Sequence, residues 1–486
     1  MTTEPSIDEI DEQDDDTGSI ADWYIKTVIA AELADYTAVR GCIVMRPYGS
    51  AIWENIQAYV DRELKATGHK NAYFPIFIPM SFLQKEAQHV EGFAPELAVV
   101  THGGGQKLTE ELVVRPTSET IIYDSYRKWI KSYRDLPMLI NQWGNAVRWE
   151  MRTRPFLRGM EFLWQEGHTA HATAEEGDEE ARLILDIYVQ FIESQLAIPV
   201  IAGKKSEREK FAGAAITYTM ESLMRDGKAL QMGTSHNLGQ NFGKAFDVRF
   251  LDADGEQKFP WSTSWAVSTR LIGALALVHG DDKGLIMPPR IAPIQVVIVP
   301  IWRKDEEKIA VEAFVNRVES ELSAAGVRLE IDRRDTVTPG FKFNDWELRG
   351  VPVRLEIGPR DVAANQVTAA RRDNREKSAI ALADIAAGVH ELLETVQVAL
   401  WERAITFRGE NTHDVSNLDE LRAGLESGPG FYWVNWCGSD ACEDAFVALK
   451  ASIRAIPLDE GERAVTGACV HCGGEGKSRV LVSKAY

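Results

Sequence analysis

The sequence predicts a multidomain α/β protein: a part organised around an antiparallel hairpin, a second α/β unit with a mixed sheet, and a small C-terminal metal-binding unit. The chain of 486 residues has the length of about three domains of roughly 150 residues each. Residues 145–168 show the two-residue period of strands that reverse around a basic turn. Four of the five cysteines lie together near the C-terminus, which separates a last, small unit from the rest.

The first 19 residues are strongly acidic. The formal net charge of the chain is −19, and this segment holds carboxylates with no basic residue beside them: Glu4, Asp8, Glu9, Asp11, Glu12, Asp14, Asp15 and Asp16. Such a run predicts a disordered, solvated tail over residues 1–19. The remaining body is still acidic, so any contact with nucleic acid requires a local basic patch.

The N-terminus has none of the features of a secretory signal, because it is acidic and no apolar segment follows. The longest apolar run, residues 291–302, is far too short to span a bilayer. We therefore expect a soluble cytoplasmic protein with no membrane partner. In that compartment cysteines rarely form structural disulfides.

Two helices and a strand are expected before residue 80. Residues 20–33 suggest an amphipathic helix, and residues 48–66 place apolar side chains at helical spacing behind Pro47, which is favoured in a first turn. Residues 72–79 are interpreted as a strand. The long helix belongs either to the core or to a subunit interface, and its periodicity does not separate the two.

Residues 113–119 predict a strand that runs into a helix capped by Thr117. Glu119 would then lie in the first turn, where a carboxylate complements the helix dipole. Alternatively, Thr117 and Glu119 project from the strand end to meet a substrate amine. Another helix is expected over residues 175–196.

The hairpin over residues 145–168 organises the chain. Strand alternation puts Arg148, Glu150 and Arg152 on one face, and in the second strand one face holds four functional residues: Phe162, Trp164, Glu166 and His168. Arginine offers a planar fork to phosphate oxygens. The combination suits a flat ring and a polyphosphate, whereas the alternative is an ordinary hairpin with one solvated face.

Residues 231–239, rich in small and hydrogen-bonding side chains, are interpreted as a loop that could also cradle a ligand. Residues 261–267 predict a strand followed by a helix with Arg270 in its first turn. A cation there is unfavourable against the dipole, so a phosphate at the helix N-terminus would compensate it, unless Arg270 is a surface residue. Residues 284–289 suggest a buried strand.

A domain boundary is expected at residues 288–293, because strands and helices alternate beyond it and predict a compact unit with a mixed sheet. The expected strands are 295–299, 327–331, 351–357 and 366–370, and the expected helices are 305–325, 343–349 and 381–404. Basic residues lie in its loops: Arg333, Arg334, Lys342, Arg354, Arg360, Arg371 and Arg372. They form either an RNA contact or a solvated face.

The C-terminal cysteines have the spacing of metal ligands. Cys437 and Cys442 form one pair, and Cys469 and Cys472 form the other. Four thiolates fit a tetrahedral zinc ion, and such a site leaves no open coordination position. A structural Zn²⁺ site is therefore predicted, whereas Cys42 is expected to serve packing in an apolar strand.

These segments together resemble the class II aminoacyl-tRNA synthetases, and more closely the prolyl-tRNA synthetases of the archaeal and eukaryotic type. Residues 40–47 with their helix resemble motif 1, the dimer-interface element, and residues 147–162 resemble motif 2. Residues 268–270 resemble motif 3; they depart from the class-wide pattern, in which Gly or Glu usually precedes the Arg, but agree with the prolyl subgroup. The resemblance covers nearly the whole chain except the acidic tail.

The resemblance implies a domain organisation. A class II catalytic domain, with an antiparallel sheet and flanking helices, would span residues 20–293, an anticodon-binding domain 294–404, and a C-terminal zinc-binding domain 405–486. Residues 341–352 resemble the anticodon domain, and the cysteines with the final Tyr486 resemble the zinc-bearing extension. The implied partners are tRNA(Pro), L-proline and a second copy of the chain, which would form a homodimer through motif 1.

The implied reaction has two steps: the carboxylate of proline attacks the α-phosphate of ATP, and the prolyl group then passes to the terminal ribose of tRNA(Pro). The expected catalytic residues are Arg148, which with Mg²⁺ would neutralise the phosphate, Glu150, which would contact the adenine amino group, and Arg270. Further ATP contacts would be Arg158 on the outer phosphates, Phe162 on adenine, and Gln231, Thr234 and Ser268. No covalent nucleophile is needed, since positioning supplies most of the rate.

The implied proline site needs a carboxylate for the ring nitrogen and apolar walls for the ring. Thr117 and Glu119 would bind the nitrogen beside Arg148, and the pocket would be shaped by Trp164, Glu166, His168, Phe211 and His236. Bacterial-type prolyl enzymes carry an editing insertion between motifs 2 and 3. This interval is short here, which predicts no editing domain in the same chain.

Two alternatives remain at this point. The first is another class IIa synthetase, such as a threonyl or glycyl enzyme, and the prolyl-type pocket residues argue against it. The second is a synthetase-like paralogue that binds RNA or regulates another protein without aminoacylating. Intact Arg148, Glu150 and Arg270 argue against that alternative, because a binding module has little use for a complete nucleotide site.

Overall fold

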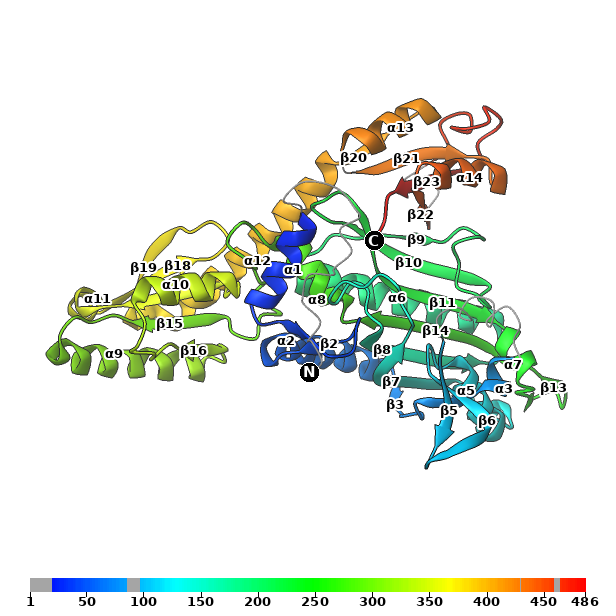
Figure 1. The fold of residues 1–486 in the computed structure, drawn as a ribbon, viewed down its shortest axis with the longest axis horizontal. Coiled ribbons are helices and arrows are strands. Elements are labelled where there is room, and N and C mark those ends of the chain that lie inside the picture. The colour runs from blue at the N-terminus through cyan, green and yellow to red at the C-terminus, as the bar shows by residue number, and fades with distance from the viewer. Residues whose placement is uncertain (1–19, 85–96, 429, 459–463) are drawn as a thin grey trace, which may run out of the picture.

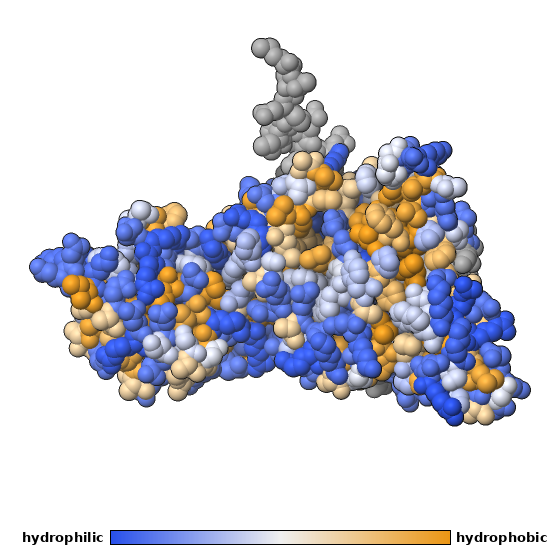
Figure 2. All heavy atoms as spheres, turned by 90° about the horizontal axis from the view of Figure 1, so that it is seen from below, coloured by the Kyte–Doolittle hydropathy of each residue, from blue (hydrophilic) through white to orange (hydrophobic). Residues whose placement is uncertain are grey.

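The computed structural model describes residues 20–84, 97–428, 430–458 and 464–486, so the predicted acidic tail lies outside them. A central part is flanked by an elongated α/β lobe on the left and by a smaller C-terminal part at the upper right (Figure 1). The face shown in Figure 2 is largely hydrophilic, with hydrophobic residues gathered in a few patches. Within the described ranges, no helix is long and apolar enough to cross a membrane.

An 11-stranded sheet forms the centre, with the strand order β20-β21-β23-β22-β9-β10-β11-β14-β8-β7-β3. From β9 to β7 every neighbouring pair is antiparallel, which confirms the predicted antiparallel sheet. The strands of this part are β3 (Lys70–Asn71), β7 (Met138–Val147), β8 (Glu161–His171), β9 (Ile201–Lys204), β10 (Ile216–Leu223), β11 (Ala229–Gly239) and β14 (Trp261–Ser268).

Helices bury their apolar stripes in the largest hydrophobic core. They are α1 (Ile20–Ala30), α2 (Pro47–Ala66), α6 (Ala174–Leu196) and α8 (Arg270–His279). A capping box starts α6, where Thr173 accepts from the Glu176 N–H at 3.2 Å and Glu176 accepts from the Thr173 N–H at 3.3 Å. The expected helices over residues 48–66 and 175–196 are confirmed.

Smaller elements surround this core. A sheet of β4 (Phe77–Pro79), β6 (Gln106–Val114) and β5 (Ala98–Gly103) lies beside α5 (Glu119–Trp129) and α3 (Met80–Leu83) (Figure 1). The remaining pieces are β1 (Ala34–Tyr36), β2 (Ile43–Met45), α7 (Asn241–Ala245), β12 (Phe250–Leu251) and β13 (Gln257–Lys258).

Two expected strands are mostly irregular chain. Of residues 72–79 only Phe77–Pro79 pair as a strand, because Pro75 has no N–H to donate to a ladder. Residues 284–289 are buried as expected, but they form no strand beyond a single bridge at Gly284. Pro288 and Pro289 have no backbone N–H to donate to a neighbouring strand. Cys42 precedes β2 and is half-buried, so it does not lie in a strand.

The expected loop over residues 231–239 is wrong, because the segment is β11, a central strand paired with β10 and β14. Its small polar side chains are satisfied within the fold; Ser235 Oγ, for example, donates to Ala181 O at 2.7 Å. The hairpin prediction also needs correction. The strand β7 ends at Val147, so Arg148 to Arg152 form no strand and share no strand face, although the alternation in β8 is confirmed.

The left-hand lobe holds a five-stranded mixed sheet in the order β16-β15-β17-β18-β19. The pairs of β15 are parallel and those of β18 antiparallel, which confirms the predicted mixed sheet. Its elements are β15 (Val296–Pro300), α9 (Asp305–Ala324), β16 (Leu329–Ile331), α10 (Pro339–Leu348), β17 (Val353–Ile357), α11 (Pro359–Ala364), β18 (Gln366–Arg371), β19 (Lys377–Ala381) and α12 (Ile385–Glu410).

The C-terminal part extends the central sheet. It contains β20 (Thr412–Asp414), α13 (Leu418–Ser427), β21 (Phe431–Trp436), α14 (Asp440–Ala448), β22 (Ser452–Pro457) and β23 (Ser478–Ser483). The strand β22 pairs with β9, where Pro457 lies opposite Gly203. A Cβ on Gly203 would lie 2.6 Å from Ile456 O, so this close pairing requires glycine.

Candidate active site

A cavity of about 320 Å³ opens on one face of the central sheet. It is lined by every nucleotide-site and proline-site residue named from the sequence: Thr117, Glu119, Arg148, Glu150, Arg158, Phe162, Trp164, Glu166, His168, Phe211, Gln231, Thr234, His236, Ser268 and Arg270. They come from β8, β11 and β14, from the first residues of α5 and α8, and from the connecting segments. Tertiary folding therefore brings together side chains that are more than 150 positions apart in the chain.

Three arginines give the cavity a strongly cationic region. Arg148 Nε donates to Pro116 O at 3.1 Å, and its guanidinium carbon lies 5.5 Å from the centre of the Phe162 ring and 5.8 Å from that of Trp164. Arg158 Nε lies 2.7 Å from Glu150 Oε2. A flat, cationic surface of this kind suits a polyanion with an aromatic ring.

Arg270 is the first residue of α8, as the sequence analysis expected. Its Nε donates to Leu157 O at 3.1 Å and its Nη1 donates to Gln231 O at 3.3 Å. Burial and the positive charge of Arg148 lower the pKa of Arg270 to about 10. Phosphate oxygens would relieve this cost, because they supply the negative charge that a buried guanidinium and a helix N-terminus both favour.

Buried carboxylates form a second group. Thr117 Oγ1 donates to Glu119 Oε2 at 2.5 Å, and Ser118 Oγ donates to Glu166 Oε1 at 2.5 Å. The N-cap of α5 is Ser118, so the expected cap at Thr117 is wrong. The Thr117 hydroxyl instead orients Glu119, which is 3% exposed and lines the cavity. Glu119 is therefore a buried carboxylate in a fixed position on the cavity wall.

The pKa values of the two cavity histidines, His168 and His236, are shifted in opposite directions. Burial lowers the pKa of His168, but the hydrogen bond and charge of Glu166, 3.0 Å away, outweigh it and raise the pKa above its ordinary value. Burial lowers the pKa of His236 to about 4. His236 stacks on Phe211 at 4.7 Å between ring centres, and it contacts Thr217 and Thr234 at 2.9 and 3.0 Å. His236 therefore presents a neutral wall.

The cavity is also lined by residues that no sequence motif indicated. Thr217 holds His236, Glu209 lies in the segment before Phe211, and Ser264 and Ala266 come from β14. The signal for β14 was present, since residues 262, 264, 266 and 268 are all small and alternate along one strand. Small side chains on one strand face leave room for a ligand.

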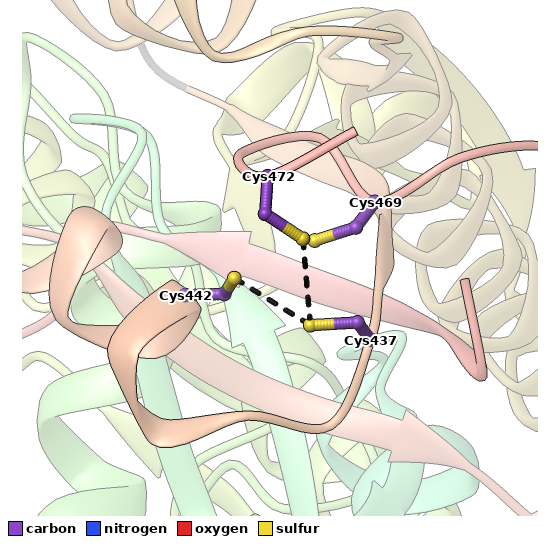
Figure 3. A group of neighbouring side chains, drawn as sticks. All are labelled: Cys437, Cys442, Cys469 and Cys472. Carbon is purple, nitrogen blue, oxygen red and sulfur yellow. Dashed lines mark hydrogen bonds between the residues drawn. The ribbon is translucent and has the colours of Figure 1, made fainter. Parts of the chain in front are cut away.

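The four C-terminal cysteines converge (Figure 3). Cys437 Sγ lies 3.5 Å from Cys442 Sγ and 3.9 Å from Cys472 Sγ, and all four sulfur atoms, including that of Cys469, lie within 4.8 Å of one another. Zn–S bonds of about 2.3 Å in a tetrahedron imply sulfur separations of about 3.8 Å. Burial raises the pKa of Cys437, but hydrogen bonds from Ser439 and the neighbouring thiols lower it to about 6. The donor set fits a zinc ion.

Most basic residues expected to form an RNA surface are engaged internally. Arg372 is 3% exposed and lies 2.6 Å from Asp281 of the central part, and Lys342 is 4% exposed with its Nζ 2.9 Å from Asp332 O. Other members pair with carboxylates in the same lobe: Arg333, Arg334, Arg354 and Arg371. Arg360 is exposed on α11. Arg372 and Lys342 are therefore buried and belong neither to a solvated face nor to an RNA contact, whereas Arg333, Arg334 and Arg360 are exposed.

Three family models match successive parts of the chain. A tRNA synthetase class II core domain (G, H, P, S and T) matches residues 100–279, an anticodon binding domain matches 295–392, and a prolyl-tRNA synthetase C-terminal domain matches 418–486. The proline–tRNA ligase of Roseiflexus sp. (strain RS-1) is 54% identical over 470 residues, which cover 96% of this chain and 97% of that protein. The chain belongs to the proline–tRNA ligase family.

Other proteins of this kind are similar over most of the chain. The chloroplastic/mitochondrial proline–tRNA ligase of Arabidopsis thaliana is 52% identical over 473 residues, which cover 96% of this chain and 86% of that protein. The crystal structure of the prolyl-tRNA synthetase from Cryptosporidium parvum, complexed with halofuginone and AMPPNP, matches with a TM-score of 0.92 and 40% identity, covering 96% and 95% of the two chains. The chain is therefore a class II aminoacyl-tRNA synthetase, as the sequence motifs indicated.

Proposed function

We propose that the cavity binds ATP and L-proline side by side, forms prolyl-adenylate and transfers the prolyl group to tRNA(Pro). The observation that carries the proposal is the single cavity in which three guanidinium groups meet a pair of buried carboxylates. A triphosphate matches the first group, and the secondary ammonium of proline matches the second. Membership of the proline–tRNA ligase family supports the same reaction.

In the first step an oxygen of the proline carboxylate attacks the α-phosphorus of ATP, and pyrophosphate leaves. Arg148 would stabilise the charge on the five-coordinate phosphorus, and Arg158 and Arg270 would hold the outer phosphates. Phe162 would stack on adenine and Glu150 would accept from its amino group. Gln231, Thr234 and Ser268 would complete the nucleotide contacts, and Mg²⁺ would be held by the phosphates.

Proline recognition rests on the carboxylate group. Glu119, held by Thr117, would accept from the ring nitrogen, while the apolar ring would lie against Trp164, Phe211 and neutral His236. Glu166 and His168 would fix the wall behind them through their 3.0 Å contact. In the second step a terminal ribose hydroxyl of tRNA(Pro) attacks the prolyl carbonyl carbon, and AMP leaves.

The C-terminal cysteines would hold a structural Zn²⁺ that shapes the loop before β23 against α14. Such a closed site with four sulfur ligands supplies no catalysis. We propose the cytoplasm as the compartment, because thiols stay reduced there and can serve as metal ligands. We also propose that the chain is divided into three domains, at residues 20–293, 294–404 and 405–486. The helix α12 runs from Ile385 to Glu410 and therefore crosses the boundary between the last two.

We propose that two copies of the chain form a homodimer through motif 1, at the hairpin in which β1 pairs with β2. Large apolar side chains in and beside β1 and β2 are exposed, namely Tyr36 at 53%, Val39 at 58% and Val44 at 51%. Clustered exposed apolar residues are typical of protein interfaces. For tRNA binding, the left-hand lobe offers exposed Arg360 together with the paired Arg333 and Arg334 at its surface.

Amino-acid-dependent exchange of pyrophosphate into ATP tests the proposal. Proline should support exchange far above threonine, glycine, alanine or cysteine. Strong exchange with threonine or glycine instead would show another class IIa specificity, and no exchange with any amino acid would favour a non-catalytic RNA-binding role. The lack of an editing domain stays a prediction, and hydrolysis of alanyl-tRNA(Pro) by the purified protein alone would contradict it.

A further inference from the structure

A buried ion cluster joins the central part to the C-terminal part. Glu221 of β10 is fully buried, and its Oε1 accepts from Lys205 Nζ at 2.8 Å. Its Oε2 accepts from Arg454 Nε and Nη2 at 3.0 and 2.8 Å. Arg454 lies in β22, so a residue of the C-terminal part supplies one of the two cations. Lys205 Nζ also donates to Arg454 O at 2.9 Å, which closes the cluster.

The same carboxylate reaches the nucleotide site through one hydroxyl group. Thr219 Oγ1 donates to Glu221 Oε1 at 2.9 Å. A threonine hydroxyl carries a single proton, so toward any other neighbour Thr219 acts as an acceptor. That neighbour is Gln231, whose Nε2 donates to Thr219 Oγ1 at 3.3 Å. The negative charge of Glu221 thus sets the direction of both hydrogen bonds.

This direction fixes the orientation of the Gln231 amide. Its nitrogen is held at Thr219, which leaves its oxygen as the end that accepts a hydrogen bond from a ligand in the cavity. The backbone of the same residue matters too, because Gln231 O accepts from Arg270 Nη1 at 3.3 Å. The negative charge of Glu221 also favours the protonated, charged form of Arg270 and so raises its pKa, against the effect of burial. One buried carboxylate therefore supports two residues of the nucleotide site.

We propose that Glu221 and Thr219 are positioning residues for ATP, and that Arg454 couples the docking of the C-terminal part to the orientation of Gln231. The proposal rests on the proposed function, which places Gln231 against the nucleotide. A purely structural role is the competing explanation, since a buried ion pair by itself is weak evidence for stability or for function. The two explanations differ in which kinetic constant changes.

Thr219→Val provides the sharpest test, because valine keeps the shape of the side chain and leaves Glu221, Lys205 and Arg454 in place. In pyrophosphate exchange we expect the KM for ATP to rise about three- to tenfold, the effect of one lost hydrogen bond. The KM for proline should stay at the wild-type value, and the melting temperature should change little. Equal changes in both KM values with a lowered melting temperature would show a structural role alone and overturn the proposal.

Ser206→Ala is the matched control. Ser206 Oγ donates to Glu443 Oε1 at 2.6 Å, and both residues are buried at the same junction between the central and C-terminal parts. Its removal should leave the KM for ATP unchanged, because Ser206 contacts Glu443 and not the chain that leads to Gln231. A rise in the KM for ATP equal to that of Thr219→Val would overturn the assignment to Thr219.

A double-mutant cycle tests the route. If Thr219 acts through Gln231, Thr219→Val should add no further loss to Gln231→Ala, whereas additive losses would overturn the route. Arg454→Lys keeps the positive charge but cannot make both hydrogen bonds to Glu221, so it should also raise the KM for ATP. A wild-type KM for ATP in this variant would show that Arg454 does not couple the C-terminal part to Gln231. A wild-type protein that fails to exchange with proline would instead refute the proposed function itself.

Discussion

Replacing Arg148 with alanine should slow the formation of prolyl-adenylate by about 100- to 1000-fold. Loss of one preorganised donor to developing charge typically costs this factor, which corresponds to about 2.7–4 kcal/mol. The upper part of the range is expected, because Pro116 O and the rings of Phe162 and Trp164 already hold the guanidinium in place. No reorganisation of Arg148 is then needed during the reaction.

The assay is proline-dependent pyrophosphate exchange, combined with binding of tRNA(Pro) in the absence of ATP. Arg148→Ala should lose exchange and keep tRNA binding, and Arg148→Lys should fall between it and the wild type, since lysine keeps the charge but not the planar fork. Arg152→Ala is the control, because Arg152 is an exposed arginine of the same segment. Equal loss of exchange and of tRNA binding, or a loss of exchange below tenfold, would refute the role assigned to Arg148.

Three further predictions concern the metal, the lobe junction and the dimer. Cys437→Ser should abolish binding of one zinc equivalent and destabilise the C-terminal part by on the order of 4 kcal/mol; a wild-type protein without zinc in elemental analysis would contradict the ligand assignment. Burial raises the pKa of Asp281, but Arg372 outweighs it and lowers the pKa from 3.8 to about 2, so the pair adds stability above pH 4 that is lost as the pH falls toward 2. Asp281→Asn should therefore cost about 1–2 kcal/mol at pH 7, allowing for solvent screening, and less at pH 3 in denaturant titrations; a cost independent of pH would exclude this linkage. Val44→Glu should weaken the dimer about 10- to 100-fold in sedimentation equilibrium, because a two-fold axis places the charge in the interface twice; an unchanged dimer would place the interface elsewhere.

Features that depend on local patterns could be predicted from the sequence. The helices α2 and α6 follow from apolar spacing with a proline or a capping box at the start. The functional face of β8 follows from strict alternation, and the cysteine cluster follows from ligand spacing. In the helices and in β8 the residues that decide the outcome lie within a few positions of one another, and in the cysteine cluster the two members of each pair do.

Features that depend on distant partners could not be predicted. The segment 231–239 has the composition of a loop, and it is a strand only because β10 and β14 supply hydrogen-bond partners on both sides. Arg372 has the appearance of a surface cation, yet its partner Asp281 lies 91 positions away. Sequence proximity carries no information about such pairs, so the charge pattern alone could not show that Arg372 is buried.

The pairing of β22 with β9 gives the C-terminal part a second role beside the proposed metal site. Gly203 permits the backbone contact that continues the sheet, and the next residues of the same strand and turn, Lys204 and Lys205, lead directly to the cluster around Glu221. A lysine buried at this depth is expensive unless its charge is met, and it is met by Glu221 together with Arg454 O, an atom of the C-terminal part. The central part on its own would therefore leave Glu221 without Arg454 and Lys205 with one acceptor fewer, directly behind Thr219 and Gln231. It follows that this edge of the proposed nucleotide site is complete only when the C-terminal strands are docked.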